Sequence, residues 1–254
     1  MQPKEDSWIP HFAGDRCLVL EFGKTIDRHL VDQVVAMNAR ISAALLEDKL
    51  DGVLECVPTF RSLAVIYDPL RTHPQSLIEE LRQLDADEVQ RTANNTSRFT
   101  IPVHYGDESG PDLAEVATLT GLAEQHVIDL HEQTEFSVYM LGFLPGFAFL
   151  GDTPKALHLP RRTEPRVRVP AGSVAIAMQL TGVYPWDSPG GWHILGKCPI
   201  PLFDAQHDQP VLFKAGDTVK FKSISLEEFN DITARKTRGQ FDRNTLVTET
   251  ECGS

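Results

Sequence analysis

Short apolar runs and segments with helical spacing alternate through the first hundred residues of the chain. Residues 16–22, RCLVLEF, form an apolar run that predicts a strand, and apolar residues then recur every three or four positions between residues 30 and 45. This spacing places them on one face of a helix. Residues 52–60 and 61–68 predict two more strands, with Pro58 at an edge or a bend of the first.

A second helix and a fourth strand complete this half of the chain. Pro74 suits the first turn of a helix whose buried stripe includes Leu77 and Leu81, and residues 98–105, RFTIPVHY, predict a strand. The predicted order is therefore βαββαβ. A four-stranded sheet with both helices on one face would bury both apolar stripes, so we expect one domain over residues 1–105.

The sequence pattern changes twice after residue 105. Asp112 and Glu115 resemble a capping box, and Gly121 can end the first of two short helices, which predicts a helical connector over residues 106–140. Prolines then recur at intervals too short for long helices, with β-branched segments between them.

These short strands indicate a small, closed or nearly closed β-barrel over residues 141–236. Ser225 and Glu228 can cap a final helix, and residues 237–254 are polar enough to predict a frayed tail. The fold class is therefore expected to be α+β.

Composition narrows the range of functions. Lys and Arg total 24 against 36 Asp and Glu, and the resulting net charge of −12 at pH 7 argues against nucleic acid as a partner. No apolar stretch is long enough to cross a bilayer and the first residues lack a signal-peptide pattern, so we expect a cytoplasmic protein that binds no membrane. The four cysteines form no CxxC pair, so we expect reduced thiols and no metal site.

Two motifs match known sites incompletely. Residues 191–198, GWHILGKC, have the glycine and lysine spacing of a P-loop, but Cys198 replaces the Ser or Thr that would hold magnesium. Residues 131–135, HEQTE, lack the second histidine of a zinc-protease helix, so we expect a solvated or capping cluster there.

Three segments between residues 142 and 196 carry the stronger signal. GFLPGFAFLG places aromatic residues between glycines, which predicts a close-approach loop with apolar walls or, alternatively, a hydrophobic barrel plug. PRRTEPRVRVPAGSVAI concentrates four arginines, which either meet an anion or pair with local Asp and Glu at the surface. TGVYPWDSPGGWHILG adds aromatic residues around a turn whose backbone amides can hold an oxyanion or a phosphate.

Together with LFDAQHDQP, FKAGDTVKF, CLVLEFG, IPVHYG and GPDL, these segments resemble the family of the 5-oxoprolinase B subunit, also called allophanate hydrolase subunit 1 or sporulation-kinase inhibitor. The resemblance covers nearly the whole chain. It implies an N-terminal ferredoxin-like unit and a C-terminal cyclophilin-like β-barrel without prolyl isomerase activity. Lys197 and Cys198 depart from the arginine and the small hydroxyl residue expected there.

The resemblance also implies a function. Such a chain is similar to one subunit of an ATP-dependent 5-oxoprolinase that opens 5-oxo-L-proline to L-glutamate, inactive alone and working with a second barrel subunit and a lactam-opening subunit. ATP with Mg²⁺ would act at the level of the complex, with no tightly bound cofactor. The alternatives are a protein-interaction inhibitor of a sensor histidine kinase and a subunit of the allophanate-hydrolase or urea-carboxylase type.

Activation of a lactam by phosphorylation creates anionic charge that arginines and backbone amides would stabilise. For acid–base catalysis the candidates are His104 and Asp112, although a histidine at a strand end is more often structural. We further expect Arg166→Lys to fold and assemble normally while losing activity. The expected substrate-binding residues are Arg161, Arg162, Arg166, Gln179, Tyr184, Ser188, Gly190, Gly191 and Trp192.

Overall fold

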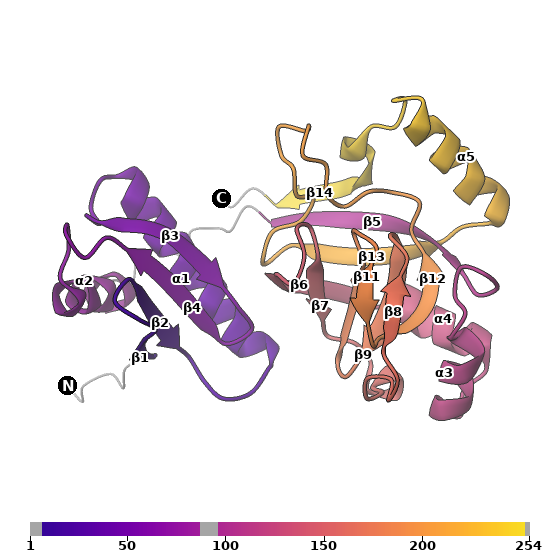
Figure 1. The fold of residues 1–254 in the computed structure, drawn as a ribbon, viewed down its shortest axis with the longest axis horizontal. Coiled ribbons are helices and arrows are strands. Elements are labelled where there is room, and N and C mark those ends of the chain that lie inside the picture. The colour runs from indigo at the N-terminus through magenta and orange to yellow at the C-terminus, as the bar shows by residue number, and fades with distance from the viewer. Residues whose placement is uncertain (1–6, 87–95, 252–254) are drawn as a thin grey trace. The chain divides into compact units, whose positions relative to one another are not determined.

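The computed structural model describes residues 7–86 and 96–251. These divide into two compact units, one containing residues 7–86 and the other residues 96–250 (Figure 1). None of the helices in the described ranges combines the length and the apolar content that a membrane crossing requires.

The N-terminal unit is an antiparallel sheet with two helices on one face. Asp27 caps the first helix, because its carboxylate accepts a hydrogen bond of 3.1 Å from the Leu30 amide. The core between sheet and helices contains Met37 and Ile41 from that helix and Leu81 from the second one. In sheet order β1-β2-β4-β3, the elements are β1 (Ile9–Phe12), β2 (Cys17–Glu21), α1 (Arg28–Leu46), β3 (Val53–Pro58), β4 (Ser62–Tyr67) and α2 (Pro74–Ala86).

The sheet differs from the predicted βαββαβ arrangement in its fourth strand. The strand expected over residues 98–105 extends from Thr96 to Tyr105 as β5 and pairs in the other unit, so the N-terminal unit ends before it. Its place in the sheet is taken by β1, whose four residues are mostly exposed. The observed order, ββαββα, does not confirm a ferredoxin-like unit.

The C-terminal unit contains a closed barrel of seven strands. The strands follow each other in the order β12-β9-β10-β7-β6-β13-β5, and β5 pairs again with β12 to close the ring. This closed barrel is consistent with the predicted cyclophilin-like architecture. Besides β5, the elements of this unit are α3 (Leu113–Thr120), α4 (Glu124–Gln133), β6 (Glu135–Leu141), β7 (Ala148–Gly151), η1 (Lys155–Leu157), β8 (Arg166–Val169), β9 (Ser173–Ala177), β10 (Leu180–Val183), β11 (Ser188–Gly190), β12 (His193–Lys197), β13 (Thr218–Ser223), α5 (Leu226–Thr237), η2 (Arg243–Leu246) and β14 (Val247–Glu251).

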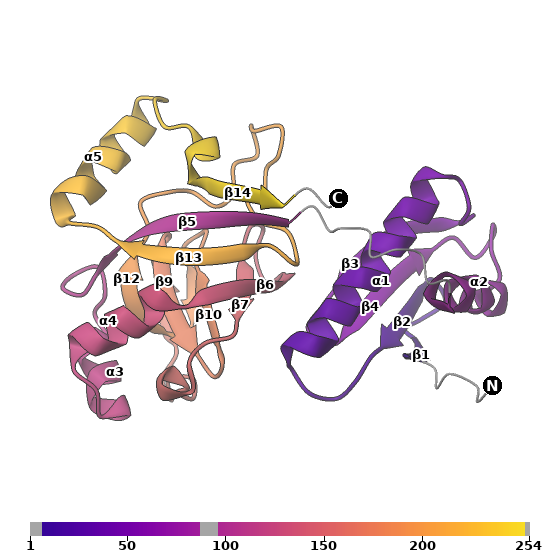
Figure 2. The same ribbon diagram turned by 180° about the vertical axis from the view of Figure 1, so that it is seen from behind.

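The segments expected to be a connector and a tail are parts of this unit. Helices α3 and α4 lie at one end of the barrel, where α3 packs against β12 and α4 against β13 (Figures 1 and 2). Strand β14 adds to the outer edge of β5, so residues up to 251 of the expected tail form structure. Ser225 and Glu228 form the predicted capping box of α5.

A buried histidine joins opposite sides of the barrel. His131 of α4 is fully buried, not solvated as expected, and its ring stacks on Phe221 at 4.5 Å. Its Nε2 lies 2.9 Å from the Thr181 hydroxyl, which itself donates to the Ala175 carbonyl, and its Nδ1 lies 2.7 Å from the Tyr105 hydroxyl. Because Thr181 uses its proton on Ala175, His131 donates from Nε2 and accepts the Tyr105 proton at Nδ1.

This network predicts a loss of stability in acid. Burial lowers the pKa of His131 to about 3, whereas an unfolded histidine titrates near 6.5. The unfolded chain therefore binds a proton that the folded chain does not, and stability falls as the pH drops below about 6.5. Between pH 7 and pH 5 this one group contributes a loss of about 2 kcal/mol, measurable by urea unfolding.

The matched control is His126, an exposed histidine on the same helix. His131→Asn should reduce the difference in unfolding free energy between pH 7 and pH 5 by about 2 kcal/mol, and His126→Asn should leave it as in the wild type. An unchanged difference in His131→Asn would show that the ring is not buried neutral.

Candidate functional site

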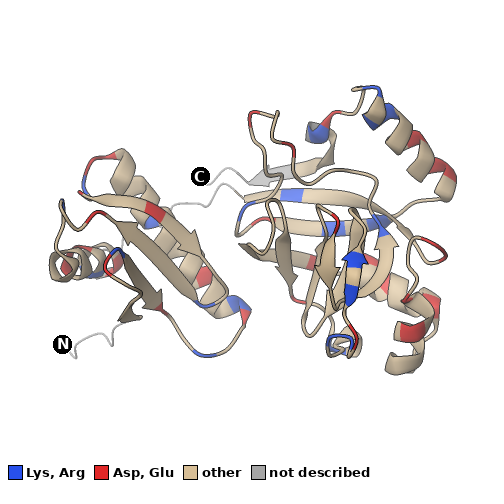
Figure 3. Cartoon of the chain, viewed as in Figure 1, with Lys and Arg blue, Asp and Glu red and all other residues tan. Residues whose placement is uncertain are grey.

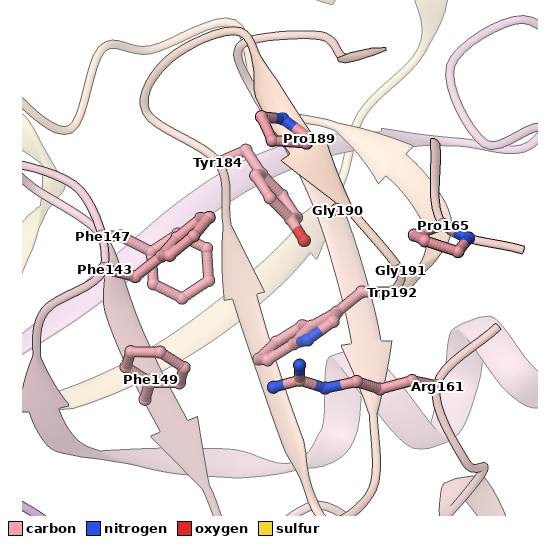
Figure 4. A pocket seen from close by; sticks show the side chains of 10 residues that line it. All are labelled: Phe143, Phe147, Phe149, Arg161, Pro165, Tyr184, Pro189, Gly190, Gly191 and Trp192. Carbon is pink, nitrogen blue, oxygen red and sulfur yellow. The ribbon is translucent and has the colours of Figure 1, made fainter. Parts of the chain in front are cut away.

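A pocket of about 290 Å³ opens beside the barrel strands, and half of its lining residues are aromatic (Figure 4). Its residues come from the loop between β6 and β7, from β7 itself, from the segment before β8 and from the stretch between β10 and β12. The lining residues are Phe143, Phe147, Phe149, Arg161, Pro165, Tyr184, Pro189, Gly190, Gly191 and Trp192.

Phe147 is the centre of the aromatic wall. Its ring is almost fully buried and makes edge contacts with Phe149 at 4.8 Å, Tyr184 at 5.2 Å and Trp192 at 5.7 Å. Edge-to-face contacts are a preferred arrangement of aromatic rings, so these rings stabilise one another in the wall. Phe143, also in edge contact with Phe147, remains 61% exposed. The glycine-flanked aromatic segment therefore forms pocket wall, as one of its two interpretations predicted.

Tyr184 supplies a polar group inside this apolar wall. The residue is only 2% exposed, and its hydroxyl has no hydrogen-bond partner among the residues that the structure describes. In Figure 4 the hydroxyl points into the pocket. Burial raises the pKa of Tyr184 to about 12 against an opposing effect of the nearby Arg161 charge, so the phenol stays protonated at neutral pH. A Cβ on Gly190 would lie 2.5 Å from this hydroxyl, which explains the glycine.

The four predicted arginines separate into one at the pocket and three that bind carboxylates. Arg166 holds Asp112 through two hydrogen bonds of 2.9 and 2.5 Å, and Arg162 donates to the same carboxylate at 3.1 Å and to Glu115. Arg168 pairs with Asp187 at the surface. Only Arg168 follows the alternative of pairing with a local acid at the surface, because Asp112 is buried and lies about fifty positions before Arg162 and Arg166. The charged positions on β8 are visible in Figure 3.

Arg161 differs from its neighbours. No carboxylate or hydrogen-bond acceptor in the described part of the chain binds its guanidinium, which lines the pocket beside Trp192 (Figure 4). An exposed guanidinium at the wall of an aromatic pocket can bind an anion there. Of the expected substrate-binding residues, the pocket therefore brings together Arg161, Tyr184, Gly190, Gly191 and Trp192.

The other expected site residues lie outside the pocket lining. Asp112 is 3% exposed and accepts four hydrogen bonds, from Arg162, twice from Arg166 and from the Ile194 amide at 2.7 Å. All its acceptor positions are used, which favours a structural role over proton transfer. His104 lies on β5, and its Nδ1 forms a hydrogen bond of 2.9 Å with the Ser109 hydroxyl.

Ser188 and Gln179 are also absent from the lining, although the structure describes both. Ser188 is buried in β11, where its hydroxyl has no partner among the described residues, and Gln179 follows β9. Residues 193–197 of the P-loop-like segment form strand β12 instead of a loop before a helix. The sequence did not predict that Pro165 and Pro189 line the pocket. Their positions next to two predicted site residues, Arg166 and Gly190, could have indicated it.

The cysteines and metal-binding side chains form no site in the described ranges. Cys17, Cys56 and Cys198 are free thiols there, and Cys252 lies outside the described residues. Burial raises the pKa of the Cys198 thiol to about 12, which makes it unreactive at neutral pH. Residues 7–86 and 96–251 contain no group of three or more His, Cys, Asp or Glu that could hold a metal ion.

The pairing of Arg166 changes the expectation for Arg166→Lys. Lysine keeps the charge but loses the two-pronged contact with a carboxylate that is 4% exposed, so we now expect a loss of about 1–3 kcal/mol in unfolding free energy. Arg168→Lys is the control, because the Arg168 side chain is 76% exposed, and it should change stability by less than about 0.5 kcal/mol. Equal stability of the two variants in urea unfolding would contradict the structural role of Arg166.

Comparison with known proteins agrees with this architecture. Residues 9–213 match the family described as carboxyltransferase domain, subdomain C and D. The chain is 41% identical to the 5-oxoprolinase B subunit of Bacillus subtilis over 227 residues, which cover 85% of this chain and 93% of the relative. It is 46% identical to the 5-oxoprolinase B subunit of Escherichia coli O157:H7 over 177 residues, 68% of this chain and 78% of the relative.

A solved structure shares the fold within a longer protein. The crystal structure of TTHA0988 has 37% sequence identity and a TM-score of 0.71, and the match covers 83% of this chain but only 40% of that one. The identity with the two curated relatives extends over more than two thirds of each of them. The chain therefore belongs to the family of the 5-oxoprolinase B subunit.

Proposed function

We propose that this chain is the B subunit of an ATP-dependent 5-oxoprolinase, which opens 5-oxo-L-proline to L-glutamate together with companion subunits. The observation that carries the proposal is the 41% identity with the Bacillus subtilis relative over 93% of its length. The pocket supports it, because a single cation in an aromatic wall suits a small cyclic carboxylate.

The pocket matches the two halves of 5-oxoproline. The substrate is a nearly flat five-membered lactam with one carboxylate. Arg161 would bind the carboxylate through its guanidinium fork, and the rings of Phe149 and Trp192 would cover the apolar part of the ring. The pocket therefore binds and orients the substrate and keeps water away from one of its faces.

The chemical step needs groups that this pocket lacks. Ring opening adds one water across the amide bond, and an unactivated lactam requires both an activating reaction and a proton donor for the leaving nitrogen. None of the ten lining residues is a histidine, an aspartate or a glutamate. ATP with Mg²⁺ would supply the activation. Because residues 193–197 of the P-loop-like segment form a strand, we propose no ATP contact for that segment.

Because the pocket lacks the groups that ring opening needs, companion subunits must supply them. We propose a second barrel subunit and a lactam-opening subunit as partners, with the chain inactive alone. The exposed ring of Phe143 at the pocket and the 46% exposed ring of Trp186 are large apolar groups of the kind that a partner covers. Co-expression followed by size-exclusion chromatography should give one larger species, and that species should release glutamate only with both ATP and 5-oxoproline.

The assay also separates the alternatives. A chain that elutes alone and inhibits autophosphorylation of a sensor histidine kinase would be an interaction module. A complex that consumes ATP with allophanate or urea and ignores 5-oxoproline would be of the urea-carboxylase type. Glutamate release by the chain without companions would contradict its proposed dependence on them.

Substitution of Arg161 tests the role of the pocket most specifically. Arg161→Gln removes the cation at the pocket, so kcat/KM of the assembled complex for 5-oxoproline should fall at least about tenfold, mainly through KM. The matched control is Arg168→Gln, which removes one arginine charge from the same segment but at an exposed ion pair outside the pocket. A normal kcat/KM in Arg161→Gln, or an equal loss in both variants, would remove Arg161 from the site.

A further inference from the structure

The polar side chains that line the pocket can all donate hydrogen bonds, and none of them carries a negative charge. Its lining contains one cation, Arg161, and no carboxylate, in a chain whose net charge is −12. Two further donors belong to the same wall: the Tyr184 hydroxyl and the Trp192 indole nitrogen have no hydrogen-bond partner within the described residues. The pocket thus offers hydrogen-bond donors and a positive charge, but no group that would neutralise a positive charge on a ligand.

Three carboxylates near the pocket are bound by other residues, and Glu164, next to Pro165, is exposed and does not line the pocket. Asp187, three residues after Tyr184, binds Arg168 and accepts a hydrogen bond of 2.8 Å from the Ala171 amide. Asp112 is held by Arg162 and Arg166, and Glu115 by Arg162. Among the described residues, no carboxylate pairs with the Arg161 guanidinium.

We infer that this pocket selects ring carboxylates that carry no ammonium group, with Arg161 on the carboxylate and Tyr184 as donor to a ring carbonyl, so that it accepts 5-oxoproline and rejects proline and glutamate. This inference rests on the proposed function and adds a mechanism of discrimination to it. Tyr184 is thereby a specificity-determining residue.

The discrimination follows from what ring opening does to the ligand. One water adds across the bond between the ring nitrogen and the carbonyl carbon; the carbon becomes a second carboxylate, and the nitrogen takes up protons to become an ammonium. In 5-oxoproline that nitrogen is part of a neutral amide. In the pocket, the new ammonium would lose water, meet no carboxylate and lie in the field of Arg161. Aromatic faces attract an ammonium too weakly to offset this loss.

Tyr184 adds recognition of the lactam carbonyl. Its protonated hydroxyl, held over Gly190 and aimed into the pocket, is a donor at neutral pH. A carbonyl oxygen on the ring satisfies this donor, whereas a plain cyclopentane ring leaves it without a partner. The donor therefore distinguishes 5-oxoproline from cyclopentanecarboxylate, which has the same ring size and the same charge.

Calorimetric titration of the full-length chain, and of the complex assembled without ATP, tests the inference with four ligands. 5-Oxoproline should bind most tightly, and cyclopentanecarboxylate roughly three- to tenfold more weakly. Proline and glutamate should bind at least about tenfold more weakly than 5-oxoproline. Tyr184→Phe should weaken 5-oxoproline binding to the level of cyclopentanecarboxylate and leave the latter unchanged, with an unchanged near-UV circular dichroism spectrum as the control for folding.

Three results would overturn the inference: binding of proline as tight as that of 5-oxoproline, unchanged 5-oxoproline binding in Tyr184→Phe, or no binding of 5-oxoproline to either preparation. Any of these, together with ATP-dependent glutamate release by the complex, would leave the proposed function standing. Selective binding of 5-oxoproline by a complex that releases no glutamate would instead contradict the proposed function and support the selectivity of the pocket.

Discussion

The carboxylate of Asp112 ties together the elements that surround the pocket. It lies at the start of α3, accepts a backbone hydrogen bond from Ile194 of β12, and holds Arg166 of β8 and Arg162 of the preceding segment. Removal of either partner from a buried ion pair leaves an uncompensated charge, so these contacts depend on one another. The backbone of Asp112 adds a second contact with Ile194, because the Asp112 amide donates a hydrogen bond of 3.1 Å to the Ile194 carbonyl.

This arrangement decides which arginine is available to a ligand. A carboxylate can accept about four hydrogen bonds, and Asp112 receives four from two arginines and one amide. Arg161, adjacent to Arg162 in sequence, has no such partner in the described part of the chain and lies in the pocket wall. The ring cluster around Phe147 forms the wall of the pocket that Arg161 also lines. In the proposed function, ligand binding and fold stability are therefore divided between neighbouring residues of one basic segment.

The sequence predicted the helices and strands of this protein better than it predicted which strands pair with each other. The helical spacing of residues 30–45 identified α1, and the segment RFTIPVHY identified β5, but a strand pattern does not say which sheet the strand joins. Strand β1 was missed because only four residues form it and most of them are exposed. His131 looked like part of a polar cluster because its burial depends on Tyr105 and Thr181, which are distant in sequence.

The same limit applied to the site. The sequence identified the segments that form the pocket, including Tyr184, Trp192 and the two glycines, because aromatic and glycine spacing is local. It did not separate Arg161 from Arg162 and Arg166, because that distinction depends on Asp112, about fifty positions earlier in the chain. Contacts of this kind depend on the tertiary structure, which brings the start of α3 next to β8.

We propose that Arg161 is the one arginine of this segment that binds the ligand, while Arg162 and Arg166 hold Asp112. Nitrogen NMR of the arginine side chains, assigned by substitution and followed during titration with 5-oxoproline, tests this claim directly. The Arg161 signal should move and saturate, and the Arg162 and Arg166 signals should stay in place. Movement of the Arg166 signal with a static Arg161 signal would contradict the account.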